Sequence, residues 1–159
     1  MNPIAGFAGG ARGAFFAVLF ISLLTACQTM REPSVRGESR VFDAGPEVAF
    51  EAAGQALEER DFRIVENKPA ERKMRAVSPI RSDAGLQTAT QRELVLFFRE
   101  TPEGKAEVDL SIWLVEENLF RFETPLATRV FLDRSPLYSL IFSDIQIEID
   151  NLLASREDE

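Results

Sequence analysis

Residues 105–115 read KAEVDLSIWLV, and apolar side chains alternate with polar ones along most of this segment. Positions 106, 108, 110, 112 and 114 are apolar, and the positions between them hold Glu107, Asp109, Ser111 and Trp113. Because successive side chains of a strand point to opposite faces of a sheet, the pattern predicts a strand with one face on a core. The other face meets water, as is common in antiparallel sheets.

The segment upstream predicts a second strand of a different kind. Residues 93–100 read ELVLFFRE, and this nearly continuous apolar run is typical of a central strand buried on both faces. Between the two strands, residues 101–104 read TPEG, with Pro and Gly placed as a turn requires. Residues 80–90 are rich in Ser, Asp, Gly and Thr and predict a loop.

Shorter apolar groups predict further strands at 41–42, 62–66 and 74–77, with a turn at 67–70, and downstream at 120–122 and 130–132. Two segments instead show helical spacing. Gly45-Pro46-Glu47 predicts a helix to about Arg60, because Pro suits the first helical position and an acid suits the positive end of the helix dipole. Ser135-Pro136 predicts a second helix to about Ala154.

These elements follow one another in the order β-α-β-β-β-β-α. We therefore expect an α+β fold of two layers, with an antiparallel sheet of about five or six strands and both helices on one face. Residues 40–155 form its single domain, and residues 156–159 form a disordered tail. Nine of the 13 Phe residues lie after position 27, which is enough for a core without disulfides.

The composition excludes several classes of function. Of the 18 basic residues only Arg12 precedes Cys27, whereas all 26 acidic residues follow it, so the chain from Cys27 onward has a net charge of −9. So acidic a protein is not expected to bind nucleic acid. With no His and one Cys, it cannot build a Ser-His-Asp or Cys-His arrangement or the usual zinc sites. We expect no enzyme, metal or cofactor.

The first 26 residues have the anatomy of a secretory signal. An uncharged apolar run at 14–24 is too short to span a bilayer and suits the central region of a signal peptide. It ends in Leu24-Thr25-Ala26-Cys27, which resembles the lipobox of bacterial lipoproteins. The resemblance implies cleavage between Ala26 and Cys27 and attachment of a diacylglyceryl group to the Cys27 thiol. The protein would then be held on a membrane by lipid.

The residues after the lipobox indicate where the anchor places the domain. In the sorting pattern of enteric lipoproteins, Asp after the lipidated Cys retains a protein in the inner membrane, and Gln28 stands there instead. The pattern implies an outer-membrane location facing the periplasm. Residues 27–39 comprise the lipidated Cys and a polar, flexible tether containing Pro33 and Gly37.

The order of elements, with a lipid anchor, also resembles the BamC-type lipoproteins of the outer-membrane assembly machinery. That resemblance implies a non-catalytic binding or scaffold role with envelope proteins as partners. Two further hypotheses stay open: a carrier that encloses an apolar ligand between the sheet and the last helix, and a hydrolase that uses carboxylates.

Two features are candidates for partner binding. Residues 60–81 hold seven basic and three acidic residues, and Arg72, Lys73 and Arg75 form the densest group. They either dock an acidic partner or lipopolysaccharide phosphates, or they pair with the acidic sheet. Trp113 lies on the polar face of its strand, where it either forms part of an interface or is covered by a loop or helix. Glu107 and Asp109 share that face; they either bind a cation or are solvated charges.

Overall fold

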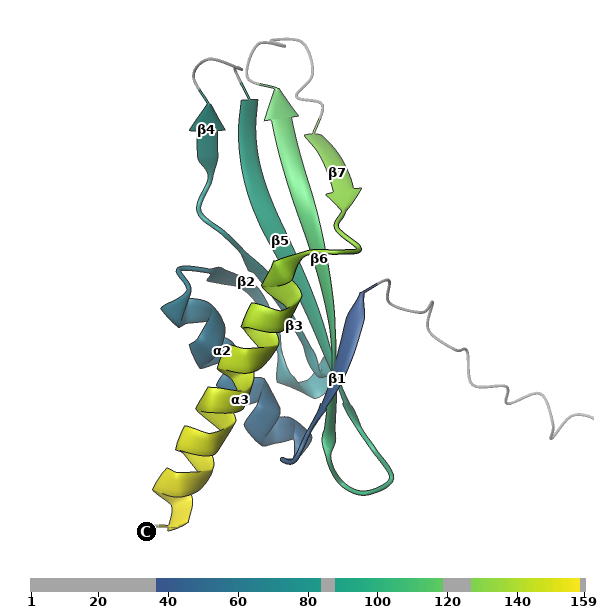
Figure 1. Cartoon of the computed structure of the whole chain (residues 1–159), viewed down its shortest axis with the longest axis vertical. Coiled ribbons are helices and arrows are strands. Elements are labelled where there is room, and N and C mark those ends of the chain that lie inside the picture. Colours follow the sequence, from purple (N-terminus) through teal and green to yellow (C-terminus); the bar gives the residue numbers. More distant parts are fainter. Residues whose placement is uncertain (1–36, 84–87, 119–126, 158–159) are drawn as a thin grey trace, which may run out of the picture. The chain divides into compact units, whose positions relative to one another are not determined.

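A long β-hairpin forms the centre of the sheet. In the computed structural model, which describes residues 37–83, 88–118 and 127–157, strands β5 (Thr88–Glu100) and β6 (Ala106–Asn118) pair over 13 residues each. The turn between them contains Gly104 at φ +77°, a left-handed conformation that favours glycine. Both strands are longer than predicted, because each continues beyond the strand that pairs with it near the turn (Figure 1).

Shorter strands flank the hairpin on both sides. Near the turn of the hairpin, β3 (Lys73–Val77) pairs with β5 on one side and with β2 (Arg63–Lys68) on the other, while β1 (Glu38–Phe42) pairs with β6. Toward its far end, β4 (Arg81–Asp83) pairs with β5, and β7 (Ala127–Phe131) pairs with β6. The resulting sheet has seven antiparallel strands, compared with the five or six expected, and the α+β architecture is confirmed.

The additional strand β4 lies within the stretch that was predicted to be a loop. Its three residues, Arg81, Ser82 and Asp83, carry no apolar pattern. Where β5 extends beyond β3, its outward backbone groups lack a partner, and pairing with β4 satisfies them. The strand therefore exists because of its neighbour.

Both helices pack on one face of the sheet (Figure 1). Helix α2 (Pro46–Glu59) starts at Pro46 as expected. Its buried side is formed mainly by alanines, whose small side chains let the helix pack close to its neighbours in the core. Helix α3 (Pro136–Glu157) starts as expected too: the Leu137 N–H donates to Ser135 Oγ at 3.3 Å. It continues through Arg156 and Glu157, so the predicted disordered tail is helical at its first two residues.

The core fills the space between the helices and the sheet. Phe42 and Phe142 are fully buried with their ring centroids 6.1 Å apart, and Phe50 packs on Phe98 at 4.9 Å. The even-numbered apolar residues of β6 from Ala106 to Ile112 are all buried in it, as the alternation predicts. At the start of β1, a Cβ on Gly37 would lie 2.0 Å from the Leu110 carbonyl oxygen, so only glycine permits this close approach.

The opposite face of the sheet carries no helix within the described residues, which corrects one prediction. Val95 and Phe97 of β5 are half-buried on this face, whereas Leu94, Leu96 and Phe98 face the core. The apolar run of β5 is therefore covered on one face only. On the other face, long charged side chains from neighbouring strands cover it in part.

Several expectations fall outside the described residues. They are the lipobox at 24–27, the tether up to residue 36, and the strand predicted at 120–122. None of the helices in the described segments is long and apolar enough to cross a membrane. The domain itself begins at the sheet, since β1 starts at Glu38, two residues before the predicted boundary.

Candidate binding surface

Trp113 lies near the middle of the helix-free face, between β5 and β7. It is half-exposed, and its ring meets Phe131 edge-on with centroids 5.1 Å apart. The guanidinium carbon of Arg129 lies 4.1 Å from the Trp113 ring centroid, which is a cation–π distance. Two side chains of β7 thus cover Trp113 in part and leave the rest of the indole open.

Glu93 connects Trp113 to the basic hairpin. It pairs across the sheet with Trp113, and its carboxylate lies 3.3 Å from Arg75 Nη1 and 2.9 Å from Arg129 Nε. Its side chain is only 10% exposed. The carboxylate therefore holds both guanidinium groups in place, one on each side of the central hairpin.

A second carboxylate organises the basic residues of β2 and β3. Glu66 lies 3.0 Å from Lys68 Nζ, 3.3 Å from Lys73 Nζ and 3.4 Å from Arg75 Nε. Hydrogen bonds from Lys68 and Lys73 hold the pKa of Glu66 below its ordinary value, and the same contact raises the pKa of Lys68. The basic residues thus do pair with acidic residues of the sheet.

The predicted acid pair on β6 has its own cation. Glu107 and Asp109 share the helix-free face, as expected from their spacing, and both contact Arg99 of β5, at 3.4 Å and 2.6 Å. The guanidinium occupies the position that a bound cation would need. No group of three or more potential metal ligands occurs in the segments that the structure describes.

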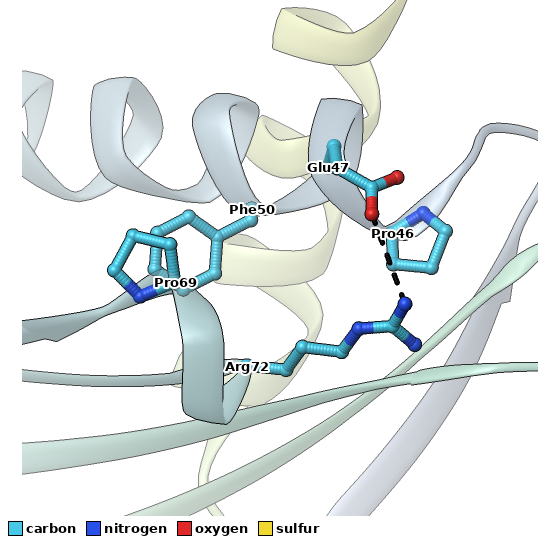
Figure 2. Close-up of a pocket in the computed structure, with 5 residues that line it drawn as sticks. All are labelled: Pro46, Glu47, Phe50, Pro69 and Arg72. Atoms are coloured by element: carbon cyan, nitrogen blue, oxygen red, sulfur yellow. Dashed lines mark ion pairs between the residues drawn. The ribbon is translucent and has the colours of Figure 1, made fainter.

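Arg72 belongs to a different surface. It has a left-handed backbone at φ 50° and contacts Glu47 and Glu100, at 3.7 Å and 3.4 Å. Its side chain lines a hollow of about 120 Å³ beside the start of α2, together with Pro46, Phe50 and Pro69 (Figure 2). Small-molecule sites usually measure about 300–1,000 Å³, so this hollow is too small for one.

The structure therefore brings together Trp113, Lys73 and Arg75 of the four predicted binding residues and separates Arg72 from them. Sequence reasoning missed Glu93, which the turn at 101–104 could have revealed, because a hairpin register counted back from that turn pairs positions 93 and 113. It also missed Arg129, and no local signal marks this residue, because β7 reaches Trp113 only through tertiary pairing.

We call the surface formed by these side chains the cationic sheet face. It consists of five cations, four carboxylates beneath or between them, and two aromatic rings: Lys68, Lys73, Arg75, Arg99, Arg129, Glu66, Glu93, Glu107, Asp109, Trp113 and Phe131. Neither a protein-family model nor a curated protein matches the sequence.

Proposed function

We propose that the chain is an outer-membrane lipoprotein, anchored through Cys27 and facing the periplasm, which acts as a non-catalytic binding or scaffold component of the cell envelope. The observation that carries the binding role is the half-exposed Trp113 between Phe131 and Arg129. Trp and Arg are the residues that most often dominate protein interfaces. The lipobox supports the anchor.

The geometry weighs against the two other hypotheses. A carrier would need space between the sheet and α3, but Tyr138, Phe142 and Ile145 fill that layer and are at most 1% exposed. A carboxylate-dependent hydrolase would need a carboxylate open to substrate. On the cationic sheet face, Glu66, Glu93 and Asp109 are each ion-paired and only 10–19% exposed.

The anchor is tested with Cys27→Ser in cells fed a labelled fatty acid. We expect the label and the membrane association to be lost, because the lipobox resemblance assigns the diacylglyceryl group to the Cys27 thiol, which the serine variant lacks. Continued labelling of this variant would contradict the lipoprotein assignment. Ser139→Ala, at an exposed position of α3, serves as the control and should keep both the label and the membrane association.

The binding role is tested by placing a photo-crosslinking amino acid at Val115, the half-exposed residue two positions beyond Trp113 on the same face. We expect capture of a defined envelope protein in living cells. The same amino acid at Gln55, exposed on α2, should not capture it. Equal capture from Val115 and Gln55 would contradict the proposal that the sheet face is the binding surface.

A further inference from the structure

The cations and carboxylates of the cationic sheet face lie at different depths. The carboxylates of Glu93, Asp109 and Glu66 are 10%, 11% and 19% exposed. Four of the five cations are more exposed than any carboxylate of the face, including Glu107 at 35%: the side-chain values are 43% for Arg75, 46% for Lys68 and Arg129, and 58% for Arg99, whereas Lys73 is 28% exposed. The outermost atoms of the face are therefore mainly positive, although the chain as a whole is acidic.

The ion pairs leave donors on this face for a further acceptor. In the described part of the chain, Arg129 uses only Nε to reach Glu93, and Arg75 uses Nε and Nη1. A guanidinium carries five N–H donors, and its terminal pair suits a carboxylate well. A ligand carboxylate could thus join each arginine without displacing the buried glutamate.

Apolar side chains lie between these cations. Val95, Phe97, Trp113, Val115 and Phe131 are half-exposed and share the face, because each occupies an outward position in the register of β5, β6 and β7. A partner that covers the face must therefore present apolar groups as well as acidic ones. In an extended segment, side chains two residues apart point to the same side, so a segment in which acidic and apolar residues take turns at every second position presents both kinds to the face.

A flat anionic membrane fits the face less well than a narrow segment does. Exposed acids lie at both ends of the central hairpin, with Glu103 in the turn at one end and Glu117, on the same side of the sheet as Trp113, at the other. A membrane plane spanning the face would approach both groups, and like charges repel within the Debye length of about 8 Å. A single segment can lie across the middle of the sheet and avoid them.

We propose that the cationic sheet face binds an extended segment of a partner protein in which every second side chain points toward the face and these side chains are by turns acidic (Asp or Glu) and apolar. This inference rests on the proposed function, since it specifies the chemistry of the partner that the scaffold recognises. It identifies Arg129 and Arg75 as the residues that set charge preference and Trp113 as the apolar anchor.

Trp113 is the only tryptophan of the chain, so its fluorescence reports directly on this face. The test uses the purified full chain in neutral detergent micelles and three end-blocked peptides. In each peptide every second residue is Ser, and the positions between hold by turns Leu and one polar residue, which is Glu, Gln or Lys. We expect the Glu peptide to change Trp113 emission with an affinity that falls as salt rises. The Gln and Lys peptides should bind at least about tenfold more weakly.

Variants separate the face from general charge effects. Arg129→Gln and Arg75→Gln should each weaken binding of the Glu peptide about fivefold, because each removes a bidentate donor. Arg156→Gln is the matched control: this arginine is 53% exposed and ion-paired with Glu51 in the helix layer, and its loss should leave affinity unchanged. Circular dichroism of every variant checks that the fold is retained.

Three results would overturn the inference. They are equal binding of the Lys and Glu peptides, no response of Trp113 to the Glu peptide, and a response to micelles doped with phosphatidylglycerol in the absence of peptide. The last result would assign the face to a membrane surface. If crosslinking from Val115 still captures an envelope protein, the proposed function stands and only the partner chemistry is wrong.

Discussion

Tyr138 of α3 hydrogen-bonds to the backbone of Ile112 in β6. Its hydroxyl accepts the Ile112 N–H at 3.2 Å and donates to the Leu132 carbonyl at 2.9 Å, while the Leu132 N–H donates to the Ile112 carbonyl at 2.9 Å. β1 pairs with β6 only up to Leu110, and β7 begins to pair at Trp113. The hydroxyl thus gives the β6 backbone a hydrogen-bond partner at the point where pairing with β1 ends and pairing with β7 begins.

Tyr138→Phe should destabilise the domain by about 1–3 kcal/mol, because two buried backbone groups lose their partner while the ring volume is kept. Urea denaturation measures the change in the free energy of unfolding. Ser39→Ala is the matched control, since it removes a hydroxyl that bonds Glu107 at an exposed position, and it should cost less than about 0.5 kcal/mol. Equal effects of the two variants would show that the buried contact is unimportant.

Burial raises the pKa of Tyr138 above its ordinary value of 10.0, with acidic Glu38 and Asp133 adding to the effect and the Ile112 N–H opposing it. A raised pKa means that the folded state favours the neutral phenol. Its contribution to stability is complete below about pH 10 and is lost as pH rises through the folded pKa. Because the chain has one tyrosine, phenolate absorbance follows this titration directly. A Tyr138 pKa at or below 10 in the folded protein would contradict the prediction.

Glu93→Gln should remove the charge that holds Arg75 and Arg129 on either side of the hairpin. We expect a loss of about 1–2 kcal/mol in the free energy of unfolding and a red shift of Trp113 emission, because Arg129 is no longer held over the indole. Glu107→Gln, at a carboxylate that is 35% exposed, should change neither quantity appreciably. Unchanged emission in Glu93→Gln would mean that Arg129 stays in place without its carboxylate.

Two glycines should respond in opposite directions to substitution by Ala. In α2, a Cβ on Gly54 would make ordinary contacts of 3.7 Å with Met74 and 3.8 Å with Ile64, so Gly54→Ala should stabilise the domain by about 0.5–1 kcal/mol. Gly37→Ala would collide with the Leu110 carbonyl and should cost about 1–3 kcal/mol. Thermal melting of both variants tests the sign. A neutral Gly37→Ala would show that β1 can move away from β6.

Arg60 at the end of α2 binds both carboxylate oxygens of Asp144 on α3, with Nη2 2.9 Å from Oδ1, and the contact raises the pKa of Arg60. A double-mutant cycle with Arg60→Gln and Asp144→Asn should give a coupling of about 1 kcal/mol. The pair of Arg156 and Glu51 also joins the two helices, but both side chains are about half-exposed, and its cycle should give less than about 0.5 kcal/mol. Equal coupling for the two pairs would argue against any benefit from the two-point contact.

The sequence by itself determined both helices, most of the strands and their order. The alternation at 105–115 gave β6, and the starts of both helices were marked by Pro46 and by Ser135, each with a local backbone reason. The stretch that resembles a secretory signal and a lipobox is likewise a local pattern, and the proposed location rests on it. The sequence also placed Trp113, Glu107 and Asp109 on one face, because a strand has a period of two.

Only the tertiary structure decided what lies against that face. Both helices pack on the opposite side, so Val95 and Phe97 remain half-exposed although their segment reads as buried. Glu93, Arg129 and Trp113 come from three strands, and β4 has no local signal at all. Such contacts depend on register and on pairing between distant segments. This pairing is stabilised by the whole sheet, so the sequence of a single strand does not reveal it.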